Sequence, residues 1–164
     1  MPNPDVPPSK LTKFFYDAQL TRSEREKLFK SLSLDEQYKI LIYGNQAIHP
    51  PDGKGVELLA EEGPSVIPFL TEKLRATQNE MTIHDIIDVF SAMALKKRYD
   101  FSKDQELLAL LDQKAQTLRG FWKDMVLWKI SMIRAGKFVP LPRQDLGLPP
   151  HLKKRLDSSQ NSVN

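Results

Sequence analysis

His84 and Asp88 have the residue types and the spacing that could support chemistry, because residues four apart lie on one face of a helix. Asp85 stands beside them in the chain. A histidine and a carboxylate in this arrangement can share a metal ion or act as an acid and a base. No third ligand has a predictable position nearby, and ordinary helix surfaces carry many such pairs. The pattern therefore favours a solvated polar face, and no catalytic, cofactor-binding or metal-binding residue is assigned.

The loop at residues 49–55, His-Pro-Pro-Asp-Gly-Lys-Gly, is a second candidate site because it precedes an expected short helix at 56–62. Exposed N–H groups at the start of a helix attract anions. The loop lacks the strand, the glycine spacing and the Ser or Thr after the lysine that define a P-loop. A plain turn is favoured, and whether the loop binds anything is left open. The chain also has no nucleophile elbow and no dinucleotide fingerprint, so we expect that it is not an enzyme.

Two basic clusters could bind an anion or a nucleic acid: Lys96, Lys97 and Arg98, and Lys153, Lys154 and Arg155. The first cluster ends an expected helix, where positively charged side chains interact favourably with the helix dipole. This structural role alone accounts for the cluster. The net charge of +3 comes entirely from residues 137–164, which hold five basic and two acidic side chains. The rest of the chain is neutral, which disfavours nucleic acid as a partner. Anion or nucleic-acid binding through the two clusters is the alternative function.

The composition is that of one folded domain, with 40% hydrophobic and 27% charged residues in a chain of 164. The chain contains no cysteine, which excludes disulfides and thiolate metal sites. No apolar run approaches the roughly 20 residues that span a bilayer, so we expect no membrane segment. The localisation is left open: a cytoplasmic protein is favoured, but the proline-rich residues 1–8 would also suit the mature form of an exported or periplasmic one.

Prolines divide the chain into a flexible leader at 1–8, one helical domain at 9–136 and an extended basic tail at 137–164. None of the 12 prolines lies between residues 69 and 139, where long helices are expected. Helix-start patterns occur at Ser9, Thr21 with Glu24, Ser33 with Glu36, Ser65, Thr82, and Ser102 with Gln105. We therefore expect an all-α fold of about seven helices.

Residues 63–136 contain two antiparallel helical pairs that resemble each other. Five apolar positions match at an offset of 37 residues: Leu70 with Leu107, Leu74 with Leu111, Val89 with Val126, Phe90 with Leu127, and Met93 with Ile130. A shared offset in this range indicates a helical repeat.

This segment resembles the HEAT-repeat family of armadillo-type helical repeats. The features that carry the resemblance are Gly63, Pro68, Leu70 and Leu74 in the first helix, and the stripe of Ile86, Val89, Phe90 and Met93 in the second. The second copy departs from the pattern, since Gln105 stands where Pro68 would recur. The resemblance implies a curved stack of helices that holds partners on the second helices of the pairs. His84, Asp88 and Ser91 would then form one exposed line of the partner surface.

The expected last helix, at 121–135, is apolar on nearly every side and must be covered on more than one face. The tail could cover it as an extended proline-rich strap that packs partly on this helix. Another protein, or a second copy in a homodimer, could cover it instead. From these features we expect a non-enzymatic protein–protein interaction module, such as an adaptor, an accessory subunit or an inhibitor, built on a HEAT-like stack.

Overall fold

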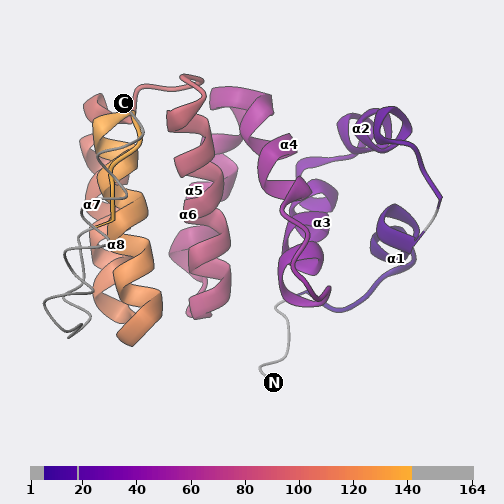
Figure 1. Ribbon diagram of the computed structural model, residues 1–164, viewed down its shortest axis with the longest axis horizontal. Coiled ribbons are helices and arrows are strands. Elements are labelled where there is room, and N and C mark those ends of the chain that lie inside the picture. Colours follow the sequence, from indigo (N-terminus) through magenta and orange to yellow (C-terminus); the bar gives the residue numbers. More distant parts are fainter. Residues whose placement is uncertain (1–5, 18, 142–164) are drawn as a thin grey trace, which may run out of the picture.

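The computed structural model describes residues 6–17 and 19–141, and all regular elements in these residues are helical (Figure 1). The described residues form eight α-helices: α1 (Lys10–Asp17), α2 (Arg22–Ser31), α3 (Leu34–Gln46), α4 (Lys54–Glu62), α5 (Ile67–Ala76), α6 (Glu80–Leu95), α7 (Gln105–Thr117) and α8 (Gly120–Ala135). Two short 3₁₀ helices, η1 (Gly63–Val66) and η2 (Phe101–Lys103), precede α5 and α7. The all-α expectation is confirmed. Most of the predicted leader and tail, including Lys153, Lys154 and Arg155, lies outside the described residues.

Two of the predicted helix starts are confirmed in full. Thr21 and Ser33 each accept a hydrogen bond from the backbone N–H three residues later, and the glutamate there bonds back to the cap. Such capping boxes satisfy N–H groups that have no partner inside the helix.

The predicted caps of the two C-terminal pairs are wrong. Asn79, and not Thr82, caps α6, because its side chain accepts from the N–H groups of Met81 and Thr82. Asp104 caps α7 in the same way, while Ser102 lies inside η2. At α5 no side chain caps the start, since η1 leads directly into the helix. An Asn or Asp caps a helix at least as well as Ser or Thr, and Asn79 and Asp104 stand directly before the first turn of their helices.

The helices lie as successive pairs along the molecule. Figure 1 shows α1 and α2 at one end, α3 and α4 next, α5 and α6 beyond them, and α7 and α8 at the other end. Helix α6 is central, because it packs on α3 and α4 on one side and on α8 on the other. Within the described residues, no helix has the length and apolar character that crossing a bilayer requires.

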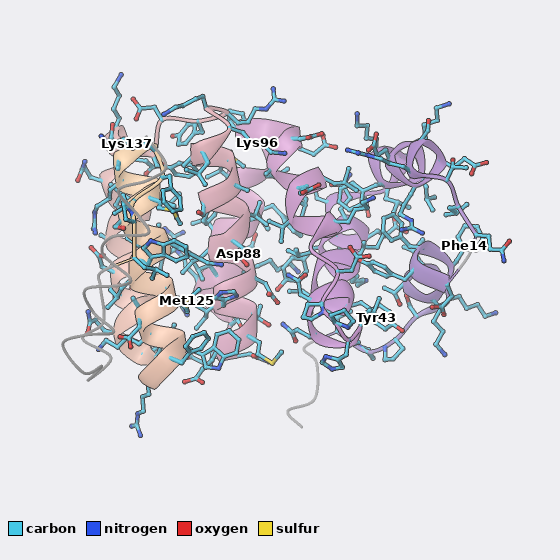
Figure 2. The ribbon with its side chains drawn as sticks, viewed as in Figure 1. Phe14, Tyr43, Asp88, Lys96, Met125 and Lys137 are labelled. Carbon is cyan, nitrogen blue, oxygen red and sulfur yellow. The ribbon has the colours of Figure 1, made fainter. Side chains whose placement is uncertain are left out.

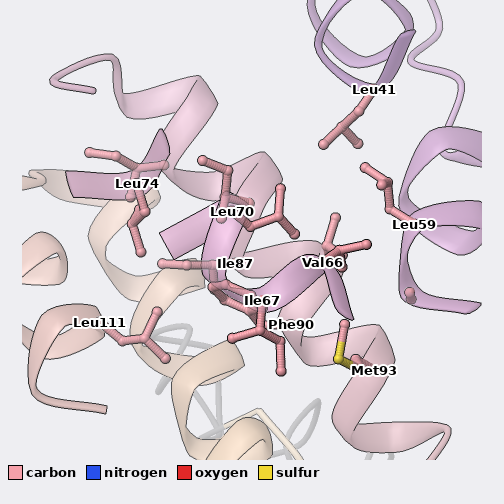
Figure 3. Close-up of a cluster of buried hydrophobic side chains, with 14 of the residues drawn as sticks. Leu41, Leu59, Val66, Ile67, Leu70, Leu74, Ile87, Phe90, Met93 and Leu111 are labelled. Atoms are coloured by element: carbon pink, nitrogen blue, oxygen red, sulfur yellow. The ribbon is translucent and has the colours of Figure 1, made fainter. Parts of the chain in front are cut away.

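One continuous core joins the pairs. Figure 3 shows a part of it in which α3, α4, η1, α5, α6 and α7 all contribute side chains, among them Leu41, Leu59, Val66, Leu70, Leu74, Ile87, Phe90, Met93 and Leu111. Burial of each such side chain contributes about 1.5–3 kcal/mol, which is what holds α6 rigidly between its neighbours.

The residues matched at the offset of 37 positions are also buried alike, with one exception. Four of the five matched pairs are buried at both positions, but Phe90 is fully buried whereas Leu127 is 39% exposed. Phe90 packs on Phe101, which opens the following pair, with ring centroids 5.6 Å apart. Leu127 belongs to the last helix of the described residues, so none of them forms a further pair that could cover it.

The beginning of the tail contacts α8 at Trp128. The indole Nε1 of Trp128 donates a hydrogen bond of 2.6 Å to the carbonyl oxygen of Val139. The ring of Phe138 meets the indole edge-on, with centroids 6.2 Å apart. Phe138 and Leu141 nevertheless stay largely exposed. The rest of the predicted strap lies outside the described residues.

Candidate functional site

A cavity of about 290 Å³ lies between the C-terminal end of α3, the loop before α4, and the first halves of α6 and α8. Its volume is near the lower end of the range for small-molecule sites. Its walls are largely apolar and come from Pro51, Val56, Met81 and Trp122. Its polar groups come from Asn45, His49, His84, Asp85 and Asp88. Residues more than 70 positions apart in the sequence therefore meet in one place.

Asp85 is the most deeply buried charged group of the cavity. The amide of Asn45 donates to its Oδ1 at 3.0 Å, and the amide of Gln46 donates to its Oδ2 at 2.9 Å. Gln46 also donates to the hydroxyl of Thr82 at 3.0 Å, and its own Oε1 is buried without a hydrogen-bond partner. Both carboxylate oxygens of Asp85 are thus held by neutral donors from α3.

Asp88 lies one helical turn further along α6 and faces α8 (Figure 2). Its Oδ1 accepts a hydrogen bond from the ammonium group of Lys129, with which it forms an ion pair. The side chains are 24% and 12% exposed, so the pair is mostly removed from water. Burial lowers the pKa of Lys129 from its ordinary value of 10.5 to about 8, and the negative charge of Asp85 opposes this shift. Lys129 therefore stays largely protonated at neutral pH.

His84 bridges the two carboxylates at the cavity. Its Nδ1 lies 3.6 Å from Oδ2 of Asp88 and 3.9 Å from Oδ1 of Asp85. Its ring meets the indole of Trp122 edge-on, with centroids 5.1 Å apart. The ring of Phe121 lies 6.0 Å from that of Trp122, centroid to centroid, and is largely exposed. With two carboxylates and one ammonium group, the cluster carries one net negative charge when His84 is neutral.

The predicted partner line of His84, Asp88 and Ser91 is not an exposed line. Ser91 is only 5% exposed, and His84 and Asp88 are partly covered by Trp122 and Lys129 of α8. The helical spacing was predicted correctly, but the face that carries it is turned toward α8. The expectation that it meets solvent is wrong, because α8 stacks on this face of α6. Asp88 interacts with a residue 41 positions later, which no local pattern reveals.

The first basic cluster is engaged largely within the chain. Lys96 forms an ion pair with Glu61 at 3.1 Å, and Lys97 donates to the carbonyl oxygen of Gly136. Arg98 is exposed. Lys97 and Arg98 also close α6, since their N–H groups bond to carbonyl oxygens of the last helical turn.

The loop at 49–55 has a structural explanation for its glycines and lysine. The side chain of Asp52 accepts from the N–H of Lys54 at 3.0 Å, so one amide that could face an anion is already used. A Cβ on Gly55 would lie 2.8 Å from the Cα of Leu41, so glycine lets α4 approach α3 closely. Three loop residues, His49, Pro51 and Gly53, also line the cavity, which the loop pattern alone did not indicate.

Among the described residues, no group of three or more His, Cys, Asp or Glu side chains is arranged to hold a metal ion. No protein-family model, curated protein or solved structure matches the chain. The geometry of the cavity and of the helical stack therefore carries the functional argument.

Proposed function

We propose that this chain is a non-enzymatic protein-interaction module whose docking surface is the face of α8 that no other described helix covers. The supporting observation is that α8 packs on the face of α6 that carries His84, Asp88 and Ser91. The repeat offset of 37 residues carries these three positions to Phe121, Met125 and Trp128 of α8. The equivalent face of α8 is thus the one on which a further helical pair would pack.

The side chains on this face have the character of an interface. Phe121 is 69% exposed, Met125 and Trp128 are half-buried, and Leu127 beside them is 39% exposed. Aromatic residues and methionine are enriched in protein interfaces, and the end of a helical stack requires a polar cap to stay soluble. Trp128 is covered in part by Phe138 and Val139, whereas the Phe121 end is open.

The partner is a protein that presents an apolar helix to this face, because a helix is what covers the equivalent face of α6. Such a partner would continue the stack, as α8 does within the chain. An adaptor, an accessory subunit and an inhibitor would all bind in this way. The alternative of anion binding through Lys96, Lys97 and Arg98 gains no support, because two of these ammonium groups already have partners in the chain.

In the test, the full chain carries a photo-crosslinking amino acid at position 121 and is expressed in its cell of origin. A second version carries the same amino acid at position 14 as a control. Phe14 is 53% exposed and lies at the opposite end of the molecule (Figure 2). We expect one defined protein to be linked from position 121 and not from position 14. That protein, once purified, should bind the chain, and Phe121→Glu should weaken binding at least about tenfold while Phe14→Glu does not.

Phe121→Glu places an acidic side chain in the first turn of α8, where the helix dipole favours it, so lost binding will not reflect lost folding. Links from position 121 only to residues 142–164 of the same chain would assign this face to the strap. Links only to a second copy, with a dimer in solution, would assign it to a homodimer. Either result would overturn the proposal.

A further inference from the structure

We propose that the cavity beside His84 is a binding site for an organic cation, an alkylammonium or guanidinium group. This site is separate from the docking face of α8 and goes beyond the proposed interaction function. The inference rests on the shape of the cavity, on its charge, and on the aromatic ring that lines it.

The charge of the cavity is unbalanced. Lys129 is paired with Asp88, whereas Asp85 is held only by the neutral amides of Asn45 and Gln46. Within the described residues, Asp85 thus accepts no hydrogen bond from a cationic side chain, although its own side chain is only 7% exposed. The ammonium group of Lys129 acts on it only through space. A negative charge in a site shielded from water attracts a cation far more strongly than the same charge on the surface. An anionic ligand would meet two carboxylates and is disfavoured.

The walls select the class of cation. Val56, Met81 and Pro51 provide an apolar surface for the carbon chain of a ligand, and a small inorganic ion would leave it without a partner. The indole of Trp122 also lines the cavity beside His84, and an indole ring attracts a positive group placed over its face. Because the cavity holds about 290 Å³, the ligand is about the size of a lysine or arginine side chain.

The experiment titrates the purified full chain with n-butylammonium and with methylguanidinium, and follows backbone and indole N–H signals by NMR. Butyrate and 1-butanol serve as the anionic and neutral comparators. The chain has two tryptophans, so Trp122 reports on the cavity and Trp128 acts as an internal control. We expect saturable shifts at Trp122, Asn45 and residues 84–88 with the two cations at millimolar concentration, and no such shifts at Trp128.

Three variants test the role of charge. Asp88→Asn and Asp85→Asn should each weaken the binding of n-butylammonium at least about fivefold, because each removes a negative charge from the cavity. Lys129→Met removes the competing ammonium group and should strengthen binding several-fold. A strengthening cannot arise from damage to the fold, so this variant decides the case even if Asp85→Asn fails to fold. Asp112→Asn, in the exposed ion pair between α7 and α8, is the matched control and should leave binding unchanged.

A further arm identifies the source of the cation. Binding of N-acetyl-lysine N-methylamide at least as tight as that of n-butylammonium would assign the site to a lysine side chain of a protein. Exclusion of the capped lysine, with free amines still bound, would assign it to a small molecule. Both results uphold a cation site. Equal shifts with butyrate or 1-butanol, an equal loss with Asp112→Asn, or weaker binding by Lys129→Met would overturn it.

Discussion

Lys129 of α8 donates a hydrogen bond to Asp88 of α6, and this mostly buried ion pair joins the second helices of two successive pairs. The pair lies at the contact between α6 and α8 and next to the negative charge of Asp85. It therefore links the packing of the stack to the electrostatics of the cavity. A buried pair of this kind is costly to break from one side, because the remaining charge loses its partner.

We expect Lys129→Met to lower the free energy of unfolding by about 1–3 kcal/mol, since it leaves Asp88 and Asp85 without an ammonium group. The double variant Asp88→Asn/Lys129→Met should lose less than the sum of the two single variants. Urea denaturation of the four proteins gives the coupling free energy directly.

The pair of Arg134 with Asp112 provides the control for this cycle, because it joins α7 to α8 but both side chains are nearly half exposed. Its coupling free energy should stay below about 1 kcal/mol. Equal coupling in the two cycles would show that burial does not strengthen the interaction between Asp88 and Lys129.

The titration of Lys129 should appear in the pH dependence of stability. Its pKa is about 8 in the folded protein and near 10.5 in the unfolded chain, so between these values the unfolded state binds more protons. Stability contributed by this group therefore rises with pH in that window. The free energy of unfolding of the wild type, minus that of Lys129→Met, should increase by roughly 1 kcal/mol per pH unit from pH 8 toward 10. A decrease over this range would show that the ion pair holds the proton on Lys129 more firmly than burial removes it.

Local patterns in the sequence predicted the all-helical class and the two helix starts at Thr21 and Ser33. A capping box involves only residues three apart, so it can be recognised without knowledge of the fold. Thr82 shows the limit of this reasoning. Its position suits a cap, but it is fully buried within α6 and accepts a hydrogen bond from Gln46 of α3. Tertiary packing, which a local pattern does not contain, decided its role.

The candidate site shows the same limit on a larger scale. The spacing of His84, Asp85 and Asp88 was visible in the sequence, and all three lie at the cavity. Their partners Asn45 and Lys129 are 40 and 41 residues away from the carboxylates they contact. Helical periodicity predicts which side chains share a face, but it does not tell whether solvent or another helix covers that face.

Gly44 lies in the last turn of α3, and its small size should be essential for the packing of α1. A Cβ at this position would lie 2.1 Å from the hydroxyl oxygen of Tyr16, which donates to the carbonyl oxygen of Ile40. Gly44→Ala must displace this largely buried ring, and we expect a loss of about 2–3 kcal/mol in the free energy of unfolding. Gly53→Ala is the control, because its Cβ would meet no atom within 4 Å. In thermal unfolding, Gly44→Ala should have a clearly lower melting temperature than Gly53→Ala. Similar melting temperatures would contradict the tight fit at Tyr16.

Lys97 ends α6 in the left-handed conformation, with φ of 56°, which is strained for any residue with a side chain. Its N–H bonds to the carbonyl oxygen of Ala94, and the N–H of Arg98 bonds to that of Met93, which is the Schellman arrangement usually completed by glycine.

Lys97→Gly should therefore raise the free energy of unfolding by about 0.5–1 kcal/mol, because relief of the strain exceeds the added freedom of the unfolded chain. The exposed contact of the Lys97 ammonium group with Gly136 should contribute little against this gain. Lys97→Ala removes the same ammonium group but keeps the strain, so it should not be stabilising. Urea denaturation of the two variants separates the backbone effect from the charge effect, and a glycine variant no more stable than the alanine variant would contradict the strain at Lys97.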